Sequence, residues 1–375
     1  LTFMVNLISV PYNALMIAHE HMKAFAYISI LDAVLKLVVV FLLQLASWDK
    51  MVVYACLLLV VAIVIRLIYS IYCKRHFEAC VYRWQFDKPL LQKMLGFAGW
   101  NFIGASSGVL KDQGVNIAIN LFCGTAVNAA RAISVQVNNA INSFVTNFMT
   151  ALNPQITKSY AKGDYDYMMK LVQQGARLSF YLLLVLSLPV IINAEGILAL
   201  WLTVVPDHTV LFVRLILVLA MCESLSGTLI TAMLATGKIR NYQLVVGGLQ
   251  MLNFPISYLL LRMHLFPEST LIVAILISLI CLCTRLLFLR SMINLRVMDY
   301  LKKVLGNVLL VASISVILPV ACFWNMSPGP LRFFTVCSVS LCSTLSVIYW
   351  IGCTPKERVF LQEKVAGLLT KFRKA

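Results

Sequence analysis

Polar side chains recur on one face of an otherwise apolar segment, residues 127–152, and an arginine lies among them. Counted at 100° per residue from Asn128, they fall within an arc of about 120°. The stripe consists of Arg131, Asn138, Asn139, Asn142, Thr146, Thr150 and Asn153. Such a stripe indicates either the wall of a polar cavity or a series of hydrogen bonds between packed helices. The arginine and the length of the stripe favour the cavity.

Two further apolar segments carry polar faces of the same kind. In residues 96–120, an arc of about 100° holds Asn101, Gly104, Gly108, Lys111 and Asp112. Its glycines would let a bulky ligand or another backbone approach closely. In residues 24–45, Ser29, Asp32 and Lys36 share a face, and the i, i+4 spacing of Asp32 and Lys36 predicts an ion pair. That pair is either functional or simply self-neutralising.

Glu223 lies deep in the apolar segment 210–236, with Ser226 and Gly227 on its side. Hydrocarbon favours the neutral form of an unpaired carboxyl group, so Glu223 is a candidate proton carrier. Hydroxyl groups in a packed interface would satisfy it equally well. With Asp112 and Asp32, it forms the set of candidate residues for ion coupling.

Basic residues outnumber acidic ones inside the apolar segments. The basic residues are Lys36, Arg66, Lys111, Arg131, Arg214 and Arg285, and the acidic residues are Asp32, Asp112 and Glu223. Desolvated Arg and Lys bind phosphate oxygens strongly, so the excess predicts an anionic ligand such as a phosphate or diphosphate. An exporter of cationic drugs should show the opposite balance.

These residues are positioned by eleven apolar segments that follow one another along the chain. A helix needs roughly 20 apolar residues to cross the hydrocarbon core of a bilayer. We expect spanning helices at residues 1–18, 24–45, 51–73, 96–120, 127–152, 178–192, 210–236, 242–262, 270–289, 304–324 and 331–351. Segment 178–192 is short, and residues 195–202 would complete it. With 61% hydrophobic and 12% charged residues, the chain is predicted to be an all-α, polytopic transmembrane helical bundle.

The basic residues between the segments predict the orientation. Of 31 Lys and Arg, 22 lie in the connections after the first, third, fifth, seventh and ninth segments and in the C-terminal tail. Only Lys50, Arg262 and Arg332 lie in the connections after the even-numbered segments. Positive loops face the cytoplasm, so we expect a multi-pass protein with a cytoplasmic C-terminus. The net charge of +16 then reflects topology and contact with membrane lipids and requires no nucleic acid.

Cofactor and metal signals are missing from the sequence. The eleven cysteines lie mostly within apolar segments and show no CxxC spacing. His19 and His21, two residues apart, would point to different faces of a helix, so we predict no metal site and no cofactor. No GxxxxGK[ST] loop is present, so if the chain transports a substrate, the energy would have to come from ion or lipid gradients or from downstream use of the product.

The spacing of the segments predicts five parts. These are a three-helix bundle (1–73), an amphipathic cytoplasmic linker (74–95), a six-helix bundle (96–292), an extra helix pair (293–352) and a basic cytoplasmic tail (353–375). Transporters often consist of two similar bundles, so a three-helix part beside a six-helix part suggests that half of one bundle is missing.

Three stretches carry a resemblance to a known family. They are PYNALMIAHEHMKAF (11–25), GTAVNAARAISVQVNNAINSFVTNFMTALNPQITKSYAKGDY (124–165) and GKIRNYQ (237–243). They resemble the polysaccharide-export flippases of the MATE-like (MOP) superfamily, especially O-antigen (lipopolysaccharide) or capsule flippases, Wzx-like and of Bacteroidetes type. The stretch around AxNPQI and KSYAKGD is the most distinctive, and the resemblance extends over the whole chain.

The resemblance implies a membrane transporter and not an enzyme. Its expected fold is two helical bundles around a central lumen, and this chain would lack about three helices of the first bundle. Its expected activity is alternating access that moves undecaprenyl-diphosphate-linked oligosaccharide across the bacterial inner membrane, in a pathway with a polysaccharide polymerase and glycosyltransferases. The resemblance implies that lumen residues bind the diphosphate and first sugars: Arg131, Lys111, Asn101, Asn138, Asn142 and Lys36.

Two other functions stay open. A proton- or sodium-coupled multidrug exporter of the same superfamily would need embedded carboxylates, which Glu223 and Asp112 would provide. A polytopic glycolipid-modifying enzyme would carry catalytic side chains on sizeable outward loops, whereas the outward connections here are short.

Overall fold

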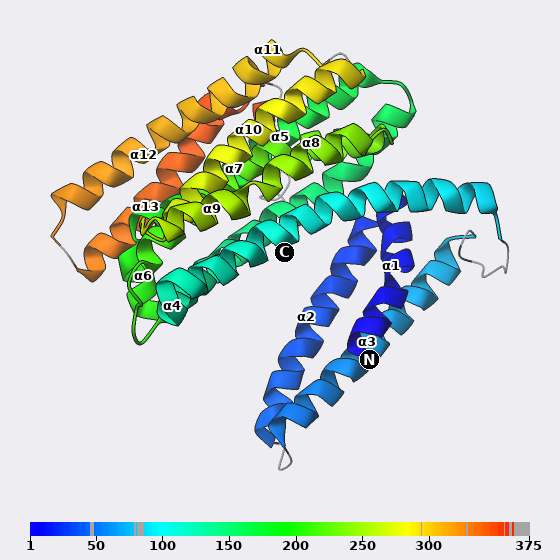
Figure 1. Cartoon of the computed structure of the whole chain (residues 1–375), viewed down its shortest axis with the longest axis horizontal. Coiled ribbons are helices and arrows are strands. Elements are labelled where there is room, and N and C mark those ends of the chain that lie inside the picture. The colour runs from blue at the N-terminus through cyan, green and yellow to red at the C-terminus, as the bar shows by residue number, and fades with distance from the viewer. Residues whose placement is uncertain are drawn as a thin grey trace. The chain divides into compact units, whose positions relative to one another are not determined.

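The computed structural model describes residues 1–45, 49–78, 80, 86–293, 295–327, 329–355, 357–359 and 362–363. All regular elements within these ranges are helices, which confirms the all-α fold class (Figure 1). They are α1 (Thr2–Ala18), α2 (Met22–Leu45), α3 (Lys50–His76), α4 (Lys88–Ala161), α5 (Tyr165–Ile192), α6 (Ala194–Trp201), α7 (Thr209–Ala235), α8 (Arg240–Met251), α9 (Asn253–Arg262), α10 (Ser269–Ile293), α11 (Val297–Tyr300), α12 (Asn307–Asn325) and α13 (Pro330–Val347). Two π-helical segments, η1 (Leu301–Gly306) and η2 (Ile348–Gly352), continue α11 into α12 and extend α13.

Nine candidate membrane spans occur among the described residues, and each is long and apolar enough to cross a bilayer. One of them, α4, has 74 residues and contains two of the expected spans. The first expected span corresponds to α1, an apolar helix of 17 residues. The eleven expected segments therefore correspond to α1 and the nine candidate spans, with α4 holding two of them, and the chain is a polytopic helical bundle.

Gly124 divides α4 into two halves. Its φ of 83° lies in the left-handed region that glycine favours, and it falls between the two expected spans. Arg131 in the second half donates a hydrogen bond to Asn116 in the first. In a straight helix, 15 residues would separate these two by about 22 Å. The chain therefore doubles back at Gly124, and the two halves lie side by side (Figure 1).

Two other expected spans differ in detail from the helices. The segment expected to be short, 178–192, is the end of α5, which begins at Tyr165 and has 28 residues. It spans through this earlier start, and α6 follows as a separate helix after Asn193. The span expected at 242–262 is interrupted at Leu252, between α8 and α9. Pro255 explains the interruption, because proline has no N–H to donate to the carbonyl four residues earlier.

The described chain forms two compact units, Leu1–Leu90 and Leu91–Ala375. The boundary falls inside the expected linker, 74–95. In the first unit, α1, α2 and α3 pack together around Met16, Tyr69 and Cys73. In the second unit, α5 packs against α7 and also against α12 and α13, while α7 and α8 both contact α10. The extra helix pair therefore packs directly on the six-helix bundle.

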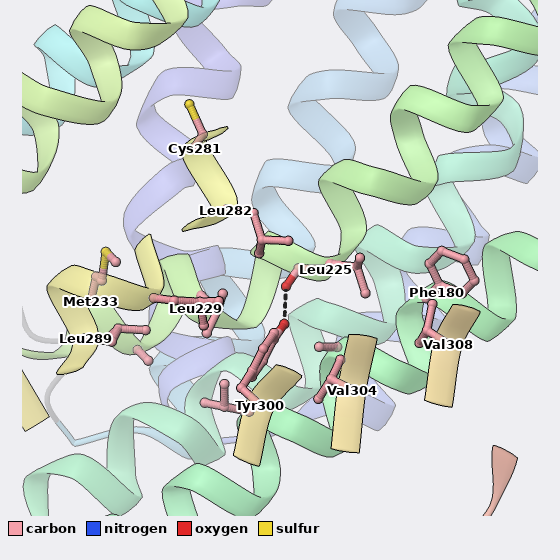
Figure 2. Close-up of a cluster of buried hydrophobic side chains, with 14 of the residues drawn as sticks. Phe180, Leu225, Leu229, Met233, Cys281, Leu282, Leu289, Tyr300, Val304 and Val308 are labelled. Atoms are coloured by element: carbon pink, nitrogen blue, oxygen red, sulfur yellow. Dashed lines mark hydrogen bonds between the residues drawn. The ribbon is translucent and has the colours of Figure 1, made fainter. Parts of the chain in front are cut away.

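A buried apolar cluster in the second unit joins α5, α7 and α10 to the helix pair (Figure 2). Tyr300 is fully buried in it, and its hydroxyl donates a hydrogen bond of 2.7 Å to the Leu225 carbonyl of α7. Val304 and Val308 continue the same face of the helix into the cluster. This packing fixes α7 and α10, which carry part of the candidate site.

Parts of the expected linker and tail lie outside the described residues. In the linker these are residue 79 and residues 81–85; in the tail they are residues 356, 360, 361 and 364–375. The remaining linker belongs partly to the ends of α3 and α4, because α3 continues to His76 and α4 begins at Lys88.

Candidate functional site

A polar cavity of about 270 Å³ lies within the second unit, and we call it the Arg131 cavity. Both halves of α4 contribute to it, as do α7, α9 and α10. Its charged lining consists of Lys111, Asp112, Arg131 and Glu223. Amide side chains and one threonine complete its polar lining: Gln113, Asn116, Asn138, Asn139, Asn253 and Thr270. The helix exteriors are apolar, so ionisable groups inside the bundle indicate a functional site.

Lys111 and Glu223 form an ion pair across this cavity. The Lys111 Nζ lies 3.0 Å from Glu223 Oε1 and 4.0 Å from Asp112 Oδ1. The lysine side chain is 16% exposed and that of Glu223 is 48% exposed, so the cation is the more deeply buried partner. Glu223 is therefore held by a lysine, rather than by the nearby hydroxyl groups considered from sequence.

Arg131 is 6% exposed, and its guanidinium contacts neutral oxygen atoms. Nη1 donates to the Asn116 side-chain oxygen and lies 3.4 Å from the Asp112 carbonyl oxygen. Among the described residues, no carboxylate lies within ion-pair distance of Arg131, and its Nε has no hydrogen-bond partner. Asn138 Oδ1 is also buried without a partner. Buried polar groups are normally satisfied, so these atoms mark a place suited to a polar ligand.

The polar stripe on α4 divides into two functions. Arg131, Asn138 and Asn139 line the cavity. Farther along, Asn153 accepts a hydrogen bond of 2.8 Å from Thr231 on α7, which joins two helices. Thr146 and Thr150 donate to backbone carbonyls one turn earlier in the same helix. Both interpretations of the stripe therefore hold, each for a different part of it.

Asn101 and Asn142 do not line the Arg131 cavity. Asn101 accepts a hydrogen bond from Gln243 on α8 and donates to the Phe97 carbonyl. Ten residues of helix separate Asn101 from Lys111, a distance of about 15 Å. Asn142 is similarly distant from Arg131. Both share the predicted helix face with the cavity residues but lie at another depth along the helix, outside the Arg131 cavity.

Asp32 and Lys36 lie in the first unit and line a separate polar cavity of about 340 Å³. Their side chains form the expected i, i+4 ion pair, with 2.6 Å between Lys36 Nζ and Asp32 Oδ2. Ser29 lines the same cavity, which confirms that the three residues share a face. Asn6 and Asn13 of α1 complete its amide lining.

Several cavity residues were missed by sequence reasoning. Gln113, Asn116 and Asn253 line the Arg131 cavity but were not among the predicted site residues. Asn116 lies in the expected span 96–120 close to Asp112. Its position within that span could therefore have identified it from sequence as a candidate site residue. Asn253 follows an interruption in a helix, and nothing in the sequence showed that this break faces the cavity. Arg285, which the sequence placed only among the basic residues inside the apolar segments, is buried, with 5% of its surface exposed.

Among the described residues, no group of three His, Cys, Asp or Glu side chains is arranged to hold a metal ion. Comparison with protein-family models, curated proteins and solved structures finds no match to this chain. The charged cavity inside an apolar helical bundle is therefore the observation from which a function must be argued.

Proposed function

We propose that this chain is a membrane transporter for a phosphate-bearing glycolipid, of the lipid-diphosphate-linked oligosaccharide class. The buried Arg131 carries this proposal. It faces a polar cavity, lacks a carboxylate partner among the described residues and has an unsatisfied Nε. A guanidinium binds phosphate oxygens in a bidentate manner, and the nearby amides are suited to sugar hydroxyls.

The charge of the Arg131 cavity supports an anionic ligand only in part. Its two cations, Lys111 and Arg131, face two carboxylates, Asp112 and Glu223. Glu223 holds Lys111, and Asp112 is 63% exposed, so among the described lining residues Arg131 is the cation left for a ligand. The described charged lining is therefore balanced, and the excess of positive charge expected from sequence is not found in this cavity, so the proposal depends on Arg131 itself.

The proposed setting is the bacterial inner membrane, with the C-terminus in the cytoplasm. The glycolipid would be supplied by glycosyltransferases, and the transported unit would be used by a polysaccharide polymerase, as O-antigen or capsule assembly requires. The resemblance to MATE-like flippases and the six spans of the second unit, followed by a helix pair, support this setting.

A binding measurement tests the proposal. The purified chain in nanodiscs of zwitterionic lipid should bind a prenyl-diphosphate disaccharide, and Arg131→Gln should weaken binding about tenfold or more, because a charged hydrogen bond contributes about 1.5–3 kcal/mol. Arg332→Gln is the matched control, since Arg332 stacks on Phe323 outside this cavity. Equal affinity of the wild type and Arg131→Gln would refute the assignment.

A second function, proton-coupled export of a cationic drug, is favoured by the Lys111–Glu223 pair. A proton or a cation could replace Lys111 as the partner of Glu223, and embedded carboxylates of this kind are typical of proton relays. In proteoliposomes with an imposed pH gradient, this function predicts uptake of a cationic dye that Glu223→Gln abolishes. Dye uptake without glycolipid binding would favour it over the first proposal.

A further inference from the structure

A second cavity, of about 260 Å³, lies beside Arg285, and we call it the Arg285 cavity. The first half of α4, α7, α8 and α10 enclose it. Its polar lining is Lys111, Glu223, Ser226, Gln250, Ser278 and Arg285. A single water needs only about 10–15 Å³ of such space, so the cavity is large enough for a hydrated anion.

Arg285 is a buried cation with few protein partners. It is 5% exposed, and its Nη1 donates a hydrogen bond of 3.0 Å to Ser226 Oγ. Its Nε is buried without a partner, and no carboxylate of the described residues lies within ion-pair distance of the guanidinium. A buried charge that only a hydroxyl satisfies is costly, and an anion would offset that cost.

Lys111 and Glu223 line both cavities, so their ion pair stands between the Arg131 and Arg285 cavities. Glu223 lies 3.0 Å from Lys111 and neutralises it, which leaves Arg285 as the charge without a carboxylate partner among the described residues of this cavity. Ser226, Ser278 and Gln250 supply neutral hydroxyl and amide groups that can donate to anion oxygens. Each cavity therefore has one arginine with no carboxylate of the described residues at ion-pair distance.

We propose that the Arg285 cavity is a second anion-binding site, which takes a phosphate or diphosphate group. It deepens the proposed function by using the same ligand class at a different site. The group is either a free phosphate from water or the head group of a phosphorylated lipid, because both present the same oxygens. Two arginine sites on either side of one ion pair would give a diphosphate ligand two places to reside within the bundle.

The number of sites is the decisive measurement. We would dialyse the purified chain, in nanodiscs of phosphatidylcholine, against radiolabelled pyrophosphate. We expect two bound equivalents for the wild type and for Arg332→Gln, and one for Arg285→Gln. The same number for the wild type and Arg285→Gln would overturn the proposal.

A second variant, which keeps Arg285, tests the site in case Arg285→Gln fails to fold. Gly108 lines the Arg285 cavity, and a Cβ at this position would meet no atom within 4 Å. Gly108→Leu should therefore fill the cavity while the helix keeps its packing, and it should also remove one equivalent. Two equivalents retained by a folded Gly108→Leu would count against the site.

The Arg131→Gln variant separates this proposal from the proposed function. One equivalent lost in Arg131→Gln, with none lost in Arg285→Gln, would leave the proposed function standing and refute the second site. The reverse result would establish the second site and refute the Arg131 assignment. Competition with farnesyl diphosphate identifies the source of the ligand. If farnesyl diphosphate displaces the labelled pyrophosphate at a tenfold lower concentration than unlabelled pyrophosphate does, the ligand is a lipid head group; if the two concentrations are equal, it is free phosphate. Either result supports the site.

Discussion

The Nζ of Lys111 lies 3.0 Å from Oε1 of Glu223, so the lysine of the candidate site already has an internal anion as its partner. An anionic ligand that approaches Lys111 must share it with Glu223 or replace Glu223. The carboxylate is thus a built-in competitor for the ligand class that the arginines favour. A substitution that removes the charge of Glu223 and keeps the shape of its side chain measures the strength of this competition.

Glu223→Gln should strengthen pyrophosphate binding, because it removes the competing charge beside Lys111. We expect the dissociation constant to fall about three- to tenfold, which corresponds to about 0.7–1.4 kcal/mol. Isothermal titration of the purified protein would measure the change. Lys111→Gln, which leaves the carboxylate without its partner, is the informative comparison and should weaken binding. Weaker binding in Glu223→Gln would show that Glu223 supports the ligand instead of competing with it.

Asn116→Asp tests Arg131 by the opposite change, the addition of an internal anion. Asn116 Oδ1 already accepts a hydrogen bond from Arg131 Nη1, so an aspartate of nearly equal shape would form an ion pair there. We expect about tenfold weaker pyrophosphate binding, with thermal stability kept or raised. Asn153→Asp is a control on the same helix, because Asn153 bonds Thr231 outside the cavity. Unchanged affinity in Asn116→Asp would exclude Arg131 as the anion ligand.

Much of the fold could be predicted from hydropathy alone. The expected spans coincide with the helices because crossing a bilayer fixes both length and composition. The turn at Gly124 also lies between residues 120 and 127, in the gap that separates two expected spans. Segment 178–192 was less accurate, because α5 begins at Tyr165 among polar residues that hydropathy does not count as helix.

The candidate site could be predicted only in part, because periodicity gives the face of a helix but not its neighbours. Arg131, Lys111 and Asn138 were found in this way. Asn101 has the same face as Lys111 but lies about 15 Å away along the helix and bonds Gln243. Arg285 is close to a helix end in sequence, and only the packing of α7 against α10 shows that it is buried.

Gly175 allows the close contact of α5 with its neighbours, and Gly175→Ala should destabilise the second unit. A Cβ at this position would overlap Leu152 Cδ2 and lie 2.7 Å from Thr228 Cγ2. Overpacking of this kind costs about 1–3 kcal/mol. Gly99→Ala is the matched control, because a Cβ there meets nothing within 4 Å. Thermal unfolding in detergent should give a lower midpoint for Gly175→Ala alone, and equal midpoints would contradict the packing.

Tyr300 joins the helix pair to α7, and two substitutions separate its hydrogen bond from its packing (Figure 2). Tyr300→Phe removes only the bond to the Leu225 carbonyl and should cost about 0.5–1.5 kcal/mol. Tyr300→Ala also empties a fully buried site and should cost about 3–5 kcal/mol, as large aromatic truncations do. Denaturant titration in mixed micelles measures both. Equal losses for the two variants would mean that the bond, not the ring, supports this contact.

The proposed orientation predicts which connections a reagent reaches from outside the cell. Lys162 lies in an exposed, basic connection between α4 and α5, and Asp207 lies in an exposed connection between α6 and α7. In a background without the eleven native cysteines, a membrane-impermeant maleimide should label Asp207→Cys in intact cells. It should label Lys162→Cys only after the membrane is opened, because basic connections stay in the cytoplasm. Labelling of Lys162→Cys in intact cells, with Asp207→Cys protected, would reverse the orientation and place the C-terminus outside.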